Sequence, residues 1–217
     1  MIEPLLLLSH LLILVYWLGG DLGAFYAAGL VTDTRLSAEA RLTAARVLNT
    51  VDMAPATCLV LALPTGALLA SARQWWPLPF GAALVIALAG LAWLAVVWRL
   101  HLTQERSALL RGIDRIVRWG VLAALVGCGA AGLLQLLPLP LFIALKCLVL
   151  AGCIGLGLLI RSVLGPYVEG FLALAAGGTT PAQDQGLRWS LARAKPMVLL
   201  IWALMLVAAW LGLTHVA

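Results

Sequence analysis

The chain has 217 residues, of which 64% are hydrophobic and 11% are charged, and its mean hydropathy is +1.06. Soluble domains carry roughly 25% charged residues, so this composition excludes an ordinary soluble fold and indicates a multi-pass membrane protein. Lys and Arg number 14 against 9 Asp and Glu. In a membrane protein we expect this excess of positive charge to set topology rather than to bind nucleic acid.

Six apolar stretches are long enough to cross a bilayer as helices, which takes about 20 residues each. They lie near residues 4–31, 53–72, 79–99, 117–137, 139–163 and 196–215. We therefore expect an all-α fold, with residues 1–217 forming a single transmembrane domain built as a six-helix bundle. The first stretch has an acidic flank and continues too far for a signal peptide, so we expect it to be a spanning helix itself.

Helices are also expected in the connections. Ser37 can cap a helix that begins well before the second membrane span. Residues 100–116 have the composition of a helix that extends beyond the bilayer. After the turn at GGTTP, Thr180 can cap a helix that starts at Pro181.

The basic residues fall almost entirely on one side of the membrane. The first-to-second, third-to-fourth and fifth-to-sixth connections hold Arg35, Arg41, Arg46, Arg99, Arg106, Arg111, Arg115, Arg118, Arg161, Arg188, Arg193 and Lys195. The other side holds Arg73 alone. Because cytoplasmic loops carry the positive charge, we expect both termini on the periplasmic side of a bacterial inner membrane.

Three ionisable residues, His10, Asp21 and Lys146, lie inside apolar runs. Such a side chain at membrane depth costs a few kcal/mol or more, so it usually faces the bundle interior and has a function. His10, Trp17 and Asp21 fall within about 20° of one line along the first helix. Gly20 lies beside this line and allows a neighbouring helix or a flat cofactor to approach closely.

Depth groups these residues into two polar levels. Counted at 1.5 Å per residue, His10 lies roughly 9 Å and Lys146 roughly 10 Å below the periplasmic face. Asp21 lies roughly 25 Å below it, and Arg161 a little deeper. We expect Asp21 and Arg161 to form either a structural ion pair or part of a proton or anion path.

His10 is the strongest candidate for a cofactor ligand. Neutral imidazole commonly binds haem iron, and glycines beside it suit a porphyrin. We expect haem b as the cofactor, with Trp17, Gly20 and Lys146 in its pocket and Lys146 near a carboxylate. His215 is in the same leaflet and is a candidate second axial ligand. Alternatively, His10 only hydrogen-bonds a neighbouring helix and Lys146 extends to the interface.

Three segments resemble a known group. SHLLILVYWLGGDLGAFY, VDMAPATCLVLALPTGALL and FIALKCLVLAGCIGLG are similar, in that order, to segments of HemJ-type and CopD-like small membrane proteins. The resemblance covers about 40% of the chain. It implies a haem-binding role for His10, a place for Lys146 in the same polar set, and a membrane oxidoreductase activity on protoporphyrinogen. The chain departs from the HemJ-type pattern after the first helix and at Arg161, where the family has a His-rich end.

These features lead to one main hypothesis and two alternatives. The main one is an integral-membrane b-type haem or porphyrin-binding protein that acts in electron transfer or porphyrin oxidation, with a redox partner or quinone. The first alternative is a CopD-like permease for a metal or small solute, with His10, Asp21, Lys146 and Arg161 lining the pathway. The second is an accessory subunit of a larger membrane complex, or a homo-oligomer.

Overall fold

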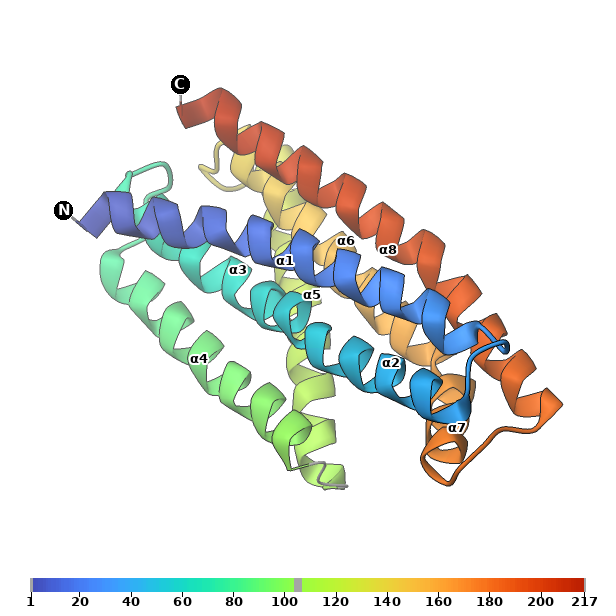
Figure 1. Ribbon diagram of the computed structural model, residues 1–217. Helices are drawn as coiled ribbons and strands as arrows, with labels where there is room; N and C mark the ends of the chain where they lie inside the picture. Colours follow the sequence, from blue (N-terminus) through green and yellow to red (C-terminus); the bar gives the residue numbers. More distant parts are fainter. Residues whose placement is uncertain (1, 104–106, 217) are drawn as a thin grey trace. The chain divides into compact units, whose positions relative to one another are not determined.

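The computed structural model describes residues 2–103 and 107–216, with the side chains of residues 215 and 216 outside the description. Of the described residues, 87% are helical and none is in a strand. The helices (Figure 1) are α1 Ile2–Thr32, α2 Ala38–Val51, α3 Met53–Ala72, α4 Phe80–Leu102, α5 Ala108–Leu133, α6 Leu141–Val163, α7 Gly165–Ala175 and α8 Pro181–Val216.

Within residues 2–103 and 107–216, six helical stretches are long and apolar enough to cross a membrane. Five are α1, α4, α5, α6 and the Pro181–Thr214 part of α8; the sixth is Ala38–Ala72, which joins α2 to α3. The chain is thus an all-α, multi-pass membrane protein, and the expected six-helix transmembrane bundle is confirmed.

Two of the expected helix starts are confirmed by their caps. The Ser37 hydroxyl accepts a hydrogen bond from the backbone N–H of Ala40 at 3.2 Å, and α2 begins at Ala38. The Thr180 hydroxyl accepts one from the N–H of Gln183 at 3.3 Å, and α8 begins at Pro181. Each bond satisfies a donor that a helix start would otherwise leave unpaired.

Other boundaries differ from the sequence-based expectation. α5 begins at Ala108, where the Ser107 hydroxyl caps it, so residues 108–116 are helical as expected, but α4 ends at Leu102. α8 runs unbroken through Pro196, where a separate spanning helix was expected to begin. A spanning helix tolerates an internal proline because neighbouring groups can satisfy the freed carbonyl. α7 was not predicted, and residues 104–106 of the expected 100–116 helix lie outside the described residues.

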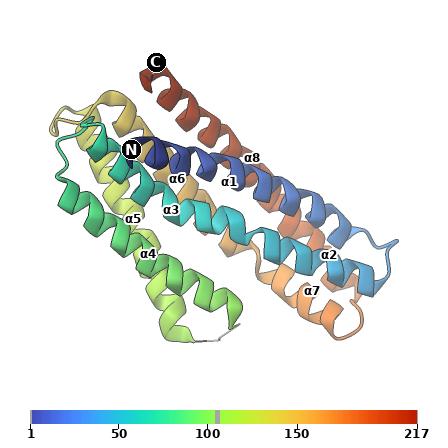
Figure 2. The same cartoon turned by 60° about the vertical axis from the view of Figure 1, so that its left-hand side comes forward.

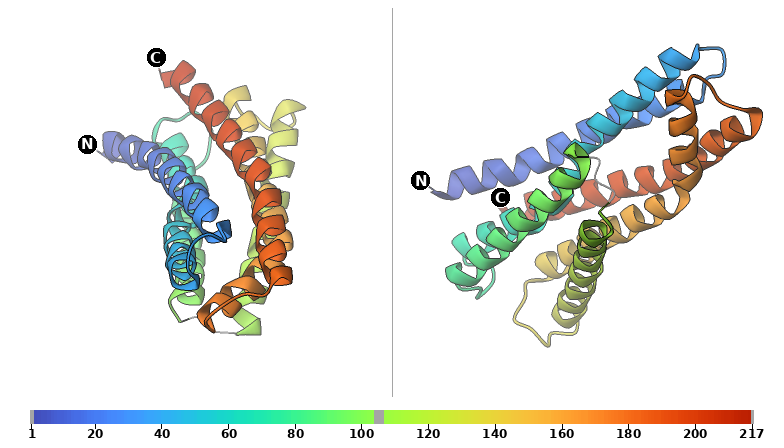
Figure 3. Two further views of the ribbon diagram at one scale, coloured as in Figure 1. Left: turned by 45° about the vertical axis from the view of Figure 1, so that its right-hand side comes forward. Right: turned by 90° about the horizontal axis from the view of Figure 1, so that it is seen from below.

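The helices pack into two compact units, each described here by itself. Unit 1 comprises Met1–Val15, Ala56–Ile154 and Leu204–Ala217, and unit 2 comprises Tyr16–Pro55 and Gly155–Ala203. In unit 1, α4 packs beside α5 (Figure 2). In unit 2, α2 packs beside α7 (Figure 3).

Close contact between helices in each unit depends on small residues. In unit 1, Gly129 of α5 lies so near α6 that a Cβ there would approach the Leu148 side chain to 2.6 Å. In unit 2, the fully buried side chains of Val31, Ala45 and Leu187 form the centre of a core between α1, α2, α7 and α8. Small residues at such positions let spanning helices approach without a hydrophobic driving force.

Candidate functional site

His10 of α1 is held in unit 1 by a hydrogen bond to Thr65 of α3. Its Nδ1 lies 2.8 Å from the hydroxyl oxygen of Thr65 on α3. The ring lies beside Gly66, where an added Cβ would be in ordinary van der Waals contact with the His10 Cε1 at 3.4 Å. Gly66 thus lies on one side of the imidazole.

The Thr65 hydroxyl determines which ring nitrogen carries the proton. Thr65 Oγ1 lies 2.8 Å from the backbone carbonyl oxygen of Leu61, which can only accept. The single hydroxyl proton is used in that bond, so Thr65 Oγ1 must accept from Nδ1–H of His10. A neutral His10 ring then has its lone pair on Nε2, and no hydrogen bond to Nε2 is found among the described residues.

Lys146 of α6 lies within electrostatic range of His10. Its Nζ lies near Gly212 of α8, where an added Cβ would be 2.7 Å away, and 6.0 Å from the centroid of the Phe142 ring. Among the described residues no carboxylate forms an ion pair with Lys146. The structure thus brings together the two residues that the sequence placed at one depth.

The other two histidines are at helix ends. Position 215 lies one turn beyond Gly212 in α8, but the side chain of His215 is outside the described residues, so its role as a second ligand stays a prediction. His101 lies near the end of α4, with its ring 6.3 Å from that of Trp98 in an edge-to-face contact.

Asp21 belongs to unit 2 and is 8% exposed. The indole N–H of Trp202 on α8 donates a hydrogen bond to Asp21 Oδ2 at 3.1 Å. The indole of Trp17, one turn earlier in α1, is buried and close enough to act on the same carboxyl group. Arg161, expected at the same level, is exposed near the end of α6 and is not among the side chains that interact with Asp21. The carboxyl group of Asp21 is therefore held by one indole hydrogen bond, with a second indole near it.

Gly20 marks a helix contact. A Cβ at Gly20 would lie 2.5 Å from Pro55 Cδ and 3.0 Å from Ala54 Cβ, at the start of α3. The sequence left a helix or a flat cofactor as the occupant of this space, and the structure places a helix there. Trp17, expected in the same pocket, is buried in the α1 span, and its place in a cofactor pocket stays a prediction.

Sequence reasoning missed some polar contacts. Arg118, counted as a loop charge, is buried inside α5, where its Nε donates to both carboxylate oxygens of Asp114 at 3.1 and 3.0 Å. The indole of Trp93 on α4 donates to the same carboxylate at 2.9 Å. The i, i+4 spacing of Asp114 and Arg118 was the available signal. Thr65 was the other omission, a polar residue inside an apolar run.

Two groups outside the spanning helices have shifted pKa values. Hydrogen bonds from Arg35 lower the pKa of the half-buried Asp33 carboxyl to about 2. In α7, burial and the negative charge of Asp52 raise the pKa of Tyr167 to about 12. The Tyr167 hydroxyl donates to the Asn49 side chain at 3.0 Å and so joins α7 to α2 in its neutral form.

The described residues contain no group of three or more His, Cys, Asp or Glu side chains that could hold a metal ion. A porphyrin supplies the equatorial nitrogen ligands of its iron, so the protein needs to provide only an axial ligand such as one histidine. The His10 arrangement suits that requirement.

Comparison of the chain with protein-family models, with curated proteins and with solved structures finds no match.

Proposed function

We propose that this chain is an integral-membrane b-type haem-binding protein, with His10 Nε2 as an axial ligand of the iron. The observation that carries the proposal is the hydrogen bond between His10 Nδ1 and a threonine whose own proton is used elsewhere. It leaves the lone pair on Nε2, the atom that would face the metal.

The Thr65 contact is of the kind that supports metal-binding histidines. Such residues almost always donate their second ring N–H to a carboxylate, carbonyl or water, which fixes the tautomer and the ring orientation. In this chain a hydroxyl oxygen is the acceptor. His10 is also restrained on one side by Gly66, so the ring is positioned before any ligand arrives.

Lys146 supports the choice of an anionic porphyrin. A lysine ammonium at membrane depth is costly unless it is paired or reaches water. A haem propionate near Lys146 would supply the anion, while the iron binds the neighbouring His10. One ligand with a metal centre and a carboxylate thus satisfies both side chains.

Bound haem would supply one-electron transfer, while His10, Thr65 and Lys146 bind and orient it. The resemblance to HemJ-type proteins makes porphyrin oxidation the favoured reaction, with a quinone or another redox partner as electron acceptor. The charge distribution favours a site in the periplasmic leaflet of a bacterial inner membrane.

A haem titration tests the proposal. Haemin is added to detergent-purified protein, and the Soret band of the bound form is followed by absorption spectroscopy. We expect wild-type protein and His101→Ala to give the same saturable spectrum, and His10→Ala to lose it. A His10→Ala spectrum identical to that of wild type, or no binding by the wild type, would overturn the assignment.

A further inference from the structure

Asp21 is a buried carboxyl group that the proposed haem site does not use. It lies in the α1 span, where the indole of Trp202 donates a hydrogen bond to it and the buried indole of Trp17 is close enough to act on it. Trp202 in turn packs on Phe25, one turn further along α1, with the ring centroids 5.7 Å apart. No Lys, Arg or His side chain is among the residues that interact with Asp21 in the described chain.

The charged and titratable groups around Asp21 come from each neighbouring element of unit 2. Asp52, between α2 and α3, is near enough to act on Asp21 electrostatically. Lys195 of α8 lies over the Phe25 ring, 5.3 Å from its centroid. Arg161 of α6 is exposed, and Tyr167 of α7 is bonded to α2. The charge that acts on Asp21 most directly is therefore another negative one.

The two indoles suit a carboxyl group that changes its protonation. An indole N–H can only donate, and an oxygen of either a carboxylate or a carboxylic acid can accept. The hydrogen bond from Trp202 therefore persists whether or not Asp21 carries a proton. An arginine or lysine partner would instead hold the group as a carboxylate.

The surroundings of Asp21 are also closely packed. Gly20, its neighbour in α1, is in close contact with Pro55 and Ala54. Trp17 is 4% exposed and lies in the same span. The carboxyl group therefore lies in a packed, largely apolar part of unit 2.

We propose that Asp21 is a proton-binding site within the membrane-spanning part of this protein. Its carboxylate takes a proton from water to form the carboxylic acid and returns it to water, while the hydrogen bond from Trp202 keeps the group in place. The ligand of the site is the proton, and the inference is independent of haem binding at His10.

Infrared difference spectroscopy of the purified protein between high and low pH tests this proposal. A buried carboxylic acid gives a carbonyl band that is absent from the carboxylate and shifts in deuterated water. We expect the wild type to show this band at low pH, Asp21→Asn to lose it, and Asp33→Asn to retain it. Asp33 is the matched control because it is a half-buried carboxylate that lies outside the spans and is paired with Arg35.

A second variant keeps the test valid if Asp21→Asn does not fold, which circular dichroism will reveal. Trp202→Phe retains the carboxyl group and removes one hydrogen-bond donor, so the band should remain and move to higher frequency. A wild-type band that neither variant changes, or the absence of any titrating band in the wild type, would overturn the proposal.

Discussion

Thr65 shows how one hydroxyl group can fix the chemistry of a residue on another helix. Its proton is donated to Leu61 within α3, so its oxygen is left to accept from His10 Nδ1. The sequence predicted His10 as a ligand because of its type and depth. It did not predict Thr65, because a threonine in an apolar helix often bonds only its own backbone.

Replacing Thr65 should weaken haem binding. Thr65→Val keeps the shape of the side chain but removes the acceptor for Nδ1–H, which leaves the tautomer and the ring orientation unfixed. Loss of such a partner typically costs roughly 10- to 100-fold in metal affinity, and we expect an effect of that size in a haem titration.

Thr57→Val is the matched control for this change. Thr57 is also on α3, and its hydroxyl accepts from the exposed Trp98 rather than from a histidine. Haem affinity should be unchanged in Thr57→Val. Equal affinities for the two valine variants would show that Thr65 does not act through His10.

The packing of the helices depends on the positions at which their backbones can approach closely. Gly20 faces Pro55 and Ala54, whereas nothing lies within 4 Å of a Cβ built at the adjacent Gly19. The sequence alone could not separate the two glycines, because both lie beside the polar line of the first helix. The difference depends on the start of α3, which no local pattern places.

Gly20→Ala should destabilise the protein and Gly19→Ala should not. Overpacking a close contact costs about 1–3 kcal/mol. Alanine at an open helix position is favoured over glycine by up to about 1 kcal/mol. Thermal unfolding in detergent, followed by circular dichroism, should thus show a lower midpoint for Gly20→Ala only. The same decrease for both variants would mean that the contact with Pro55 is absent.

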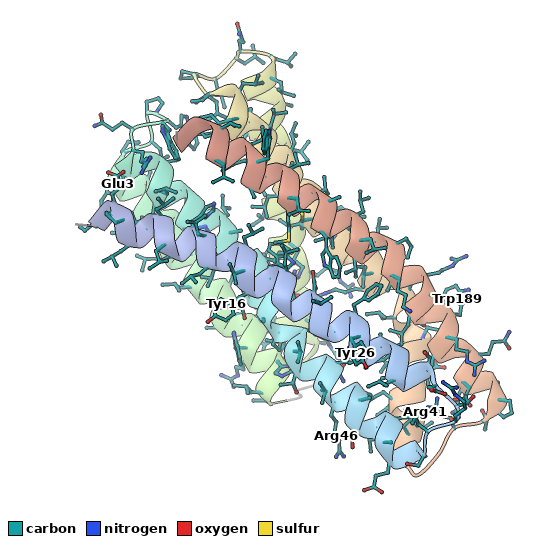
Figure 4. The ribbon with its side chains drawn as sticks, turned by 45° about the horizontal axis from the view of Figure 1, so that its top comes forward. Glu3, Tyr16, Tyr26, Arg41, Arg46 and Trp189 are labelled. Carbon is teal, nitrogen blue, oxygen red and sulfur yellow. The ribbon has the colours of Figure 1, made fainter. Side chains whose placement is uncertain are left out.

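Arg41 connects three elements of unit 2. Its side chain is 5% exposed, and it donates to the Val31 carbonyl at 2.9 Å, the Thr179 hydroxyl at 3.2 Å and Asp184 Oδ1 at 2.6 Å. It therefore joins the end of α1 to the start of α8. In Figure 4, Arg41 lies in this cluster and Arg46, on the same helix, points away from it.

Arg41→Met should destabilise unit 2, because it leaves Asp184 without its cation and the Val31 carbonyl without its donor. Removal of one partner from a buried pair costs about 3–5 kcal/mol, and we expect the lower end because Asp184 is partly exposed. Thermal unfolding would measure the change. Arg46→Met is the control, and equal midpoints for the two variants would contradict this role for Arg41.

The whole molecule could be predicted in outline. Long apolar runs identified the six spans, and cap residues identified the starts of α2 and α8. The contact between Asp21 and Trp202 could not be predicted, because these residues are 181 positions apart. Depth estimates also could not show whether Arg161 or another side chain is the partner of Asp21. An error of one helical turn changes which side chains can meet.

The structure refines the charge argument for topology. Arg41 and Arg118 are buried and ion-paired, so they are poor topology signals, but the same connections still contain most of the other basic residues. On the opposite side, Arg73 is itself paired with Glu3 at 2.6 Å. The imbalance that favours periplasmic termini therefore remains.

Reporter fusions in a bacterial host should confirm this orientation. Alkaline phosphatase attached after Ala217 should be active, because the enzyme matures only in the periplasm. The same reporter attached after Gly178, in the connection between α7 and α8, should be inactive. Fluorescent-protein fusions at the two points should give the opposite pattern, and reversed activities would place the termini in the cytoplasm.

The central claim, that the imidazole of His10 binds haem iron, is tested most directly by chemical rescue. His10→Gly removes the imidazole and leaves a space against Thr65 and Gly66 that free imidazole can enter. We expect this variant to lose the wild-type haem spectrum and to regain it when imidazole is added, with His101→Gly unaffected by either step. A wild-type spectrum in His10→Gly without imidazole would contradict the claim.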